Sequence, residues 1–240
     1  MDSISRHIRF PMMLALVVAV ACPSPGWAGS ASYERMAPLN QYLMVRQAEI
    51  DLARSAAPPA ISIHATLLVL GRHGYETAEV GTNGFTCLVE RSWTSPFDSS
   101  EFWNWKMRGP ICYNPAAART VLLYTMQRTT MALSGLTKAQ MLDRTNAAVA
   151  DNHLPAPEPG SMSYMMSKYG DLGDGVGPWL SHLMIYAPKR DGAKDGASWG
   201  ADLPASPVII DTSHRVMPEP ETIFMLPVAH WSDGTPAPPR

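Results

Sequence analysis

The stretch that decides the fold class spans residues 114–153 and reads NPAAARTVLLYTMQRTTMALSGLTKAQMLDRTNAAVADNH. Asn114 is a favoured N-cap and Pro115 suits the first helical position. The apolar residues that follow recur at helical spacing until Gly135, a residue typical of helix ends. Thr137–Gln140 then has the form of a capping box. The stretch therefore predicts two consecutive helices in the middle of the chain.

Strand-like segments lie on both sides of this helical pair. Before it, residues 65–70, 75–80 and 85–90 predict a three-strand meander, with an Asn-Gly turn before its third strand. After it, Gly- and Pro-rich loops separate the predicted strands 162–168, 182–187, 208–211 and 222–228. A helix is predicted over 38–57, ended by Pro58-Pro59.

These elements predict an α+β fold. We expect an antiparallel or mixed sheet of about six or seven strands, with the N-terminal helix and the central helical pair packed on one face. The chain has 46% hydrophobic and 17% charged residues, so it is able to bury a substantial core. Its formal charge of -2 and lack of a basic stripe argue against nucleic acid as a partner.

The N-terminus predicts export. Arg6 and Arg9 precede the apolar run 12–21, and Gly26-Trp27-Ala28 offers small residues at the positions that a signal peptidase recognises. We expect residues 1–28 to be a signal peptide cleaved after Ala28, residues 29–231 to form one domain, and 232–240 to be a disordered tail. A lipoprotein modified at Cys22 and a buried N-terminal helix are the alternatives. The predicted location is therefore periplasmic or secreted, with no membrane span after cleavage.

Cleavage after Ala28 would leave two cysteines, Cys87 and Cys112. An even pair in an oxidising compartment predicts a disulfide, whereas two buried free thiols are the alternative.

Three segments carry a resemblance: 83–93 (NGFTCLVERSW), 108–115 (RGPICYNP) and 231–236 (WSDGTP). With them the chain resembles a group of uncharacterised secreted bacterial proteins over most of its mature length. The resemblance implies an exported bacterial protein and carries no activity and no functional residue.

Between the two cysteines lies an aromatic loop, which we define as residues 93–108. Flat rings with charged neighbours are typical of surfaces that bind sugars, aromatic ligands or cations. The candidate binding residues are Trp93, Phe97, Phe102, Trp103, Trp105 and Arg108. The alternative, which we favour, is that these rings hold an irregular segment onto the domain.

Catalytic candidates are weak. Glu90 ends an apolar strand, where burial would raise its pKa, and Arg91 follows it. A site assembled in space would add His182 from a distant strand. The histidines do not show the spacing of zinc ligands, and the sequence contains no nucleotide-binding motif, so no metal or cofactor is predicted.

The sequence does not identify a function. Of the possible functions, the first hypothesis is a non-catalytic protein that binds a small molecule or an envelope protein through the aromatic loop. The first alternative is a hydrolase with a Glu/His site assembled in space, and the second is an envelope structural or assembly protein.

Overall fold

The computed structural model describes residues 33–174, 180–189, 210–211 and 215–238. The predicted signal peptide, its cleavage site and Cys22 lie outside the described residues.

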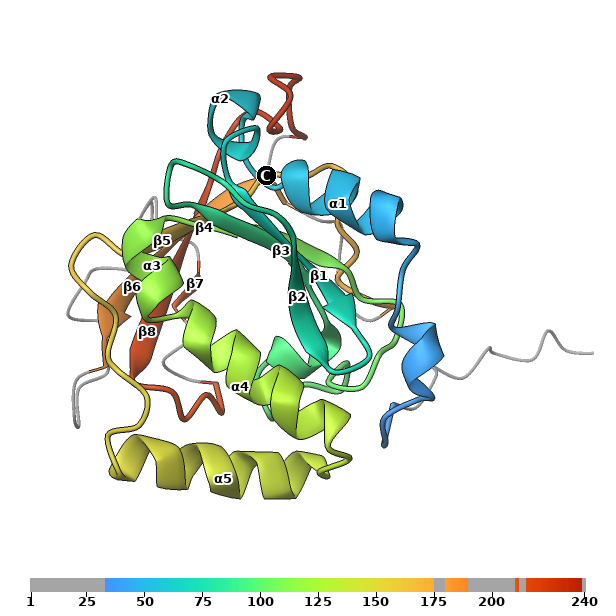
Figure 1. Cartoon of the computed structure of the whole chain (residues 1–240). Helices are drawn as coiled ribbons and strands as arrows, with labels where there is room; N and C mark the ends of the chain where they lie inside the picture. The colour runs from blue at the N-terminus through green and yellow to red at the C-terminus, as the bar shows by residue number, and fades with distance from the viewer. Residues whose placement is uncertain (1–32, 175–179, 190–209, 212–214, 239–240) are drawn as a thin grey trace, which may run out of the picture.

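The predicted helical pair is present, with one interruption. Asn114 caps α3 (Pro115–Arg119), and its side chain accepts a hydrogen bond from the backbone of Ala117. Thr120 leaves the helical conformation, so α4 (Leu122–Leu133) is a separate helix. The predicted capping box opens α5 (Lys138–Ala150), which lies beside α4 (Figure 1).

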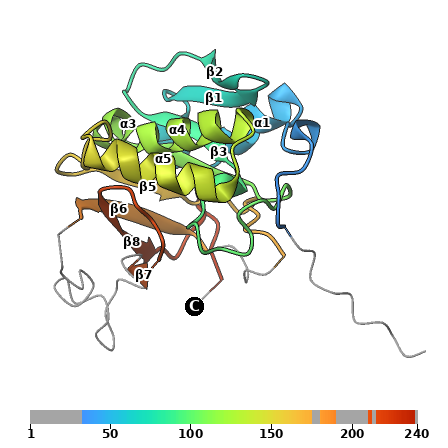
Figure 2. The ribbon, with the colours of Figure 1, turned by 90° about the horizontal axis from the view of Figure 1, so that it is seen from below.

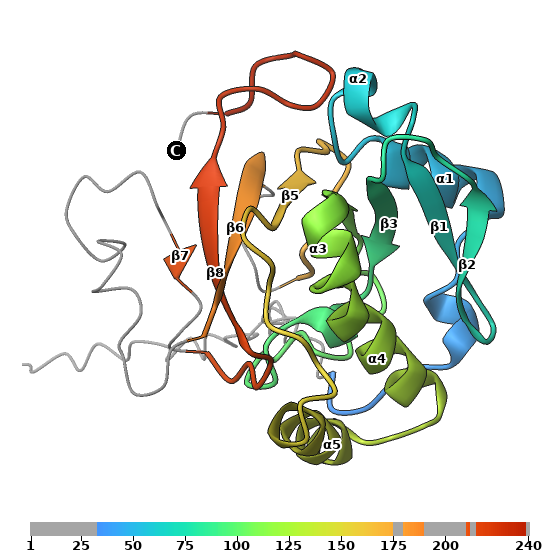
Figure 3. The same cartoon turned by 60° about the vertical axis from the view of Figure 1, so that its left-hand side comes forward.

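Among the described residues, eight strands form one mixed sheet in the order β2-β1-β3-β4-β5-β6-β8-β7, which confirms the α+β class (Figure 3). Two residues of strand β7 are described, and residues 208 and 209 of the strand predicted over 208–211 lie outside the described residues. The strands are β1 (Thr66–Gly71), β2 (Gly74–Glu79), β3 (Thr86–Glu90), β4 (Gly109–Tyr113), β5 (Met162–Met165), β6 (His182–Pro188), β7 (Ile210–Asp211) and β8 (Glu221–Pro227). The sequence analysis missed β4, because its Gly-Pro start is typical of a turn.

The predicted meander is wrong in its pairing. Strands β1 and β2 form a hairpin, but β3 pairs in parallel with β1 rather than with β2. Residues 80–85 therefore cross the start of β1. The crossing is tight: a Cβ on Gly81 would lie 2.2 Å from the backbone nitrogen of Thr66, so only glycine fits there. The Asn-Gly turn belongs to this crossing and not to a hairpin.

Helices cover both faces of the sheet, which corrects the prediction of one covered face. Helix α1 (Arg46–Arg54) packs through Ile50 and Ala53 on one face of β1, β3 and β4. The other face carries Leu88 and Ile111, which pack against residues of α3 and α4. Figure 2 shows α4 and α5 on this second side of the sheet. Alternate residues of β1 and β3 are apolar on both faces, so both need a cover.

The predicted N-terminal helix is shorter than expected. A single 3-10 turn, η1 (Leu39–Gln41), is followed by non-helical chain before α1 begins at Arg46, and Pro58-Pro59 starts a short helix, α2 (Pro59–Ser62). Tyr42 lies buried in this gap, and its hydroxyl donates a 2.8 Å hydrogen bond to the carbonyl of Trp103. The apolar residues at helical spacing in 38–57 therefore pack into the core from two separate segments, one around η1 and one in α1, and do not belong to one helix.

The tail predicted to be disordered packs against the domain over residues 232–238. Ser232 donates from its backbone to Met166 and from its side chain to the carbonyl of Ser55. Asp233 forms an ion pair with Lys168 at 2.6 Å.

Candidate functional site

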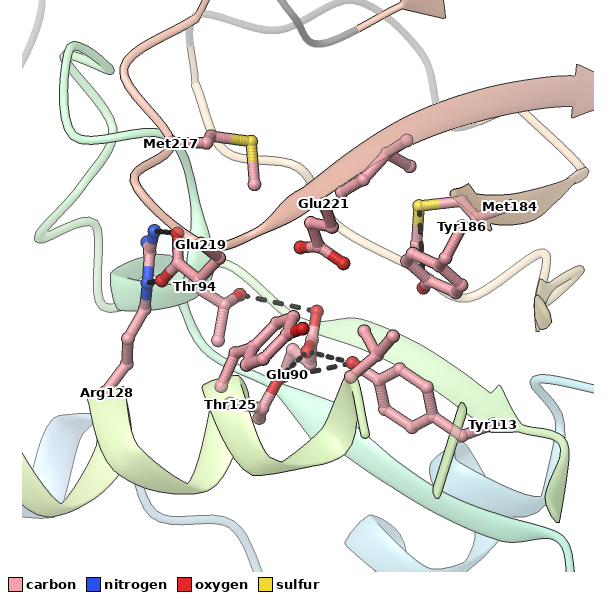
Figure 4. Close-up of a pocket in the computed structure, with 13 residues that line it drawn as sticks. Glu90, Thr94, Tyr113, Thr125, Arg128, Met184, Tyr186, Met217, Glu219 and Glu221 are labelled. Atoms are coloured by element: carbon pink, nitrogen blue, oxygen red, sulfur yellow. Dashed lines mark hydrogen bonds and ion pairs between the residues drawn. The ribbon is translucent and has the colours of Figure 1, made fainter. Parts of the chain in front are cut away.

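A small polar cavity lies between α4 and the sheet, and we call it the carboxyl cavity. Its volume is about 60 Å³. Five separate segments of the chain contribute to it: the end of β3 with the turn after it, β4, α4, β6, and β8 with the residues before it. The lining residues are Glu90, Thr94, Tyr113, Val121, Tyr124, Thr125, Arg128, Met184, Tyr186, Met217, Glu219, Glu221 and Ile223 (Figure 4).

Glu90 enters the cavity from the last position of β3. Strand alternation places it on the same face as Leu88, toward α4. Its Oε1 accepts hydrogen bonds from the hydroxyls of Tyr113 (2.7 Å) and Thr125 (2.6 Å), and its Oε2 accepts a longer one from Thr94 (3.3 Å). Burial raises the pKa of Glu90, and the three donors only partly oppose this effect.

Glu221 begins β8 and points toward Glu90 across the cavity (Figure 4). Its side chain is buried, with 7% of the residue's surface exposed. Within the described part of the chain, its Oε2 has no hydrogen-bond partner. Burial, and secondly the charge of Glu219, raise the pKa of Glu221 well above its usual value. Burial therefore favours the neutral acid form of this carboxyl group over the carboxylate.

Arg128 and Glu219 form a buried, two-pronged ion pair at one side of the cavity. Arg128 Nε and Nη2 donate to the two oxygens of Glu219 at 2.6 and 2.8 Å. The remaining nitrogen donates to the backbone carbonyls of Trp93 and Ser95. The guanidinium also lies 4.2 Å from the ring centre of Phe97. Four of the five N–H groups of Arg128 are thus engaged, so the side chain mainly holds the wall of the cavity.

Three tyrosines complete the polar lining. Tyr113 donates to Glu90, Tyr124 donates to the carbonyl of Pro155, and the hydroxyl of Tyr186 lies 2.7 Å from that of Ser163. Burial raises the pKa of each, so all three remain neutral phenols.

No group of three or more His, Cys, Asp or Glu side chains with the geometry of a metal site occurs among the described residues. The three glutamates of the cavity therefore do not form a ready metal site.

The structure separates the three catalytic candidates of the sequence analysis. Only Glu90 lines the carboxyl cavity. Arg91 is fully buried and pairs with Glu49 of α1 at 2.8 Å on the other side of the sheet. His182 starts β6, where its Nδ1 lies 2.7 Å from the carbonyl of Leu180, and burial lowers its pKa. The expected Glu/Arg/His site is therefore not assembled.

The aromatic loop packs inward rather than outward. Four of its rings are at most 4% exposed; they belong to Trp93, Phe97, Phe102 and Trp103. Phe102 stacks on Phe97 and meets Trp103 edge-on, with ring centres 5.1 and 4.8 Å apart. Only Trp105, at 37%, is exposed. Arg108 donates to the carbonyls of Trp105 and Met107. This placement matches the favoured alternative, in which the rings anchor the loop.

The disulfide between Cys87 and Cys112 is present, as predicted. The two residues lie directly opposite each other on β3 and β4, on the face covered by α1. The bond therefore joins the strands that carry Glu90 and Tyr113 into the cavity.

The sequence analysis missed Arg128, Tyr186, Glu219 and Glu221. Two signals were present in the sequence. Arg128 is the only charged residue between Arg119 and Lys138, in a helix otherwise free of charge. Glu219 and Glu221 flank Pro220 immediately before an apolar strand, where carboxyl groups are unusual.

Comparison of the chain with protein-family models, with curated proteins and with solved structures found no match. Among the described helices, none combines the length and the apolar character that crossing a membrane requires. The geometry of the carboxyl cavity is therefore the basis for a functional proposal.

Proposed function

We propose that the protein binds a small polar molecule in the carboxyl cavity. The observation that carries this proposal is the buried Oε2 of Glu221, which has no hydrogen-bond partner among the residues that the structure describes. Leaving a buried polar atom without a partner costs about 1–3 kcal/mol, and such sites occur where a fold keeps a place for a ligand. This proposal keeps the binding function expected from the sequence and moves it away from the aromatic loop.

Two methionines make the proposal testable. Met184 and Met217 line the cavity, whereas Met131 and Met141 are buried in the core beside the aromatic loop. With ¹³C-methyl methionine labelling, a library of small polar compounds is screened by NMR. We expect compounds that shift the Met184 and Met217 signals and leave those of Met131 and Met141 in place. Signals are assigned with Met184→Leu and Met217→Leu.

A matched pair of variants completes this test. Glu221→Gln changes the unpartnered carboxyl group, and Glu158→Gln changes an exposed carboxylate paired with Arg119. We expect binding to weaken in Glu221→Gln and to persist in Glu158→Gln. If no compound in the library shifts the cavity methionines, the proposed function is wrong.

A second candidate function is acid–base hydrolysis, because two carboxyl groups with raised pKa values, Glu90 and Glu221, face each other. A panel of chromogenic esters and glycosides tests it. Turnover that is lost in both Glu90→Gln and Glu221→Gln would favour an enzyme, whereas binding without turnover favours the first candidate.

We also infer that the protein is exported from a bacterial cell. The disulfide supports this inference, since such bonds persist mainly in oxidising compartments. The predicted signal peptide and the resemblance to secreted proteins agree with it. Mass spectrometry of the protein from its native host tests the inference: a mature N-terminus at Gly29 is the expected result, and an uncleaved chain in the cytosol would contradict it.

A further inference from the structure

We propose that the carboxyl cavity takes the protonated head of a primary amine, with Glu221 and Glu90 as the groups that accept its N–H hydrogen bonds. This inference rests on the proposed function and names the chemical class of the ligand. A carboxylic acid or a phosphate would be a poor occupant, for reasons that follow from the contacts.

The first reason is the balance of charge. Among the described residues, three carboxyl groups line the cavity, from Glu90, Glu219 and Glu221, against the single guanidinium of Arg128. That guanidinium is already committed to Glu219 and to two backbone carbonyls. An anionic ligand would meet two further carboxyl groups with no cation left to receive it.

The second reason is the balance of donors and acceptors. The hydroxyls that line the cavity already have partners in the protein: Tyr113 and Thr125 donate to Glu90, Thr94 donates to the carbonyl of Arg91 and at longer range to Glu90, Tyr124 donates to Pro155, and Tyr186 is paired with Ser163. Acceptor capacity remains on Glu221 Oε2, which has no partner in the described residues, and on Glu90 Oε2, whose one bond is 3.3 Å long. An ammonium group has three donors and no acceptor, so it complements this set.

The third reason is size. A cavity needs a volume of roughly 10–15 Å³ to hold one water molecule. The carboxyl cavity, at about 60 Å³, therefore holds a few waters or an ammonium group with the first carbons of its chain. Of the lining residues, only Thr94, Met184 and Met217 are not buried. The carbon chain of the amine would therefore leave the cavity past the two flexible methionine side chains.

Binding should release a proton. Glu221 is faced by Glu90 of β3, Tyr113 of β4, Tyr124 and Arg128 of α4, Tyr186 of β6 and Glu219, with Lys189 acting from farther away. Before the amine binds, burial and the charge of Glu219 favour the neutral acid form of Glu221. When the ammonium enters with its charge, the carboxyl proton leaves to solvent and an ion pair forms. Affinity for the amine should therefore rise with pH.

The test uses propylamine, which is a cation at neutral pH, and 1-propanol, which has nearly the same shape without the charge. Titration calorimetry on the full chain, in two buffers of different ionisation enthalpy, measures affinity and proton release together. We expect propylamine to bind, to shift the Met184 and Met217 methyl signals, and to release up to about one proton. We expect 1-propanol to bind at least about tenfold more weakly.

Variants test whether Glu221 is the group that binds the amine. Glu221→Gln should weaken propylamine at least about tenfold and remove most of the proton release, since the neutral amide cannot form the ion pair. Glu158→Gln should change neither. If Glu221→Gln does not fold, Glu90→Gln replaces it, with the same expected direction.

The outcomes separate this inference from the proposed function. If propylamine and 1-propanol bind equally, or if another class of compound shifts the cavity methionines while propylamine does not, the amine inference is overturned and the proposed function stands. If neither propylamine nor any library compound shifts those signals, both are wrong.

Discussion

At the scale of the residue, Glu90 and Arg91 show how neighbours in sequence acquire different roles. The side chain of Glu90 meets Tyr113 and Thr125 beneath α4, whereas that of Arg91 meets Glu49 of α1 across the sheet. Successive side chains of an extended backbone point to opposite faces of a sheet. The charges of Glu90 and Arg91 therefore lie on opposite faces and do not pair with each other.

Glu221 predicts an unusual dependence of stability on pH. The raised pKa of Glu221 means that the folded protein keeps a proton that the unfolded chain loses near pH 4.5. The stabilisation is therefore complete below that pH and declines as pH rises toward the folded pKa, by up to about 1.4 kcal/mol per pH unit. Urea unfolding of wild type and Glu221→Gln between about pH 5 and pH 8 should give a shallower decline for the variant.

Other groups do not obscure this difference. His182, whose lowered pKa has the opposite effect on stability, is present in both proteins. Glu158→Gln serves as the control. The hydrogen bond with Arg119 lowers the pKa of Glu158, so this carboxyl group changes the stability only at a pH below the range that is measured. Parallel curves for wild type and Glu221→Gln would contradict the assignment.

The ion pair of Arg128 and Glu219 predicts a large and asymmetric effect of mutation. Arg128→Met leaves Glu219 buried without its partner, so we expect a loss of about 3–5 kcal/mol in the free energy of unfolding. The double variant Arg128→Met/Glu219→Gln should recover part of that loss. Arg119→Met, at the exposed pair with Glu158, should change little. A double variant as unstable as the single one would show that the pair is not the cause.

At the scale of the element, the crossing of residues 80–85 over β1 depends on one glycine. In Gly81→Ala the added Cβ would meet backbone atoms of Ala65 and Thr66, which cannot move aside as a side chain would. We expect a loss of about 3 kcal/mol or more. Gly109→Ala is the matched control, because its Cβ would meet its neighbours at 3.5 Å or more. Thermal unfolding of both variants measures the difference, and equal melting temperatures would refute the tight crossing.

The elements also show which local signals are reliable. The caps at Asn114 and Thr137 were predicted and are present, because a cap is satisfied within one turn of its own helix. The Asn-Gly turn misled the prediction of a meander, since which strand accepts β3 depends on the rest of the sheet. Strand β4 was not predicted because its Gly-Pro start is typical of a turn, and only its pairing with β3 and β5 shows it to be a strand.

At the scale of the whole molecule, the disulfide ties together the strands that form the floor of the carboxyl cavity. It closes a loop with a sequence separation of 25, for which chain entropy predicts a stabilisation of about 3.5 kcal/mol. We expect Cys87→Ala/Cys112→Ala to lose about this amount in urea unfolding, and reduced wild type to behave alike. An unchanged free energy of unfolding would show that the bond does not constrain the unfolded chain.

The sequence by itself determined the α+β class, the capped helices, the disulfide pair and the candidacy of Glu90. Each of these depends on short-range chemistry: hydrophobic periodicity, caps, cysteine parity, or a charge at the end of an apolar strand. Only the tertiary structure decided that the aromatic loop is buried, that Arg91 and His182 lie outside the site, and that Glu221 faces Glu90. These facts depend on contacts between segments up to about 130 residues apart, which strand order and packing set and local pattern does not.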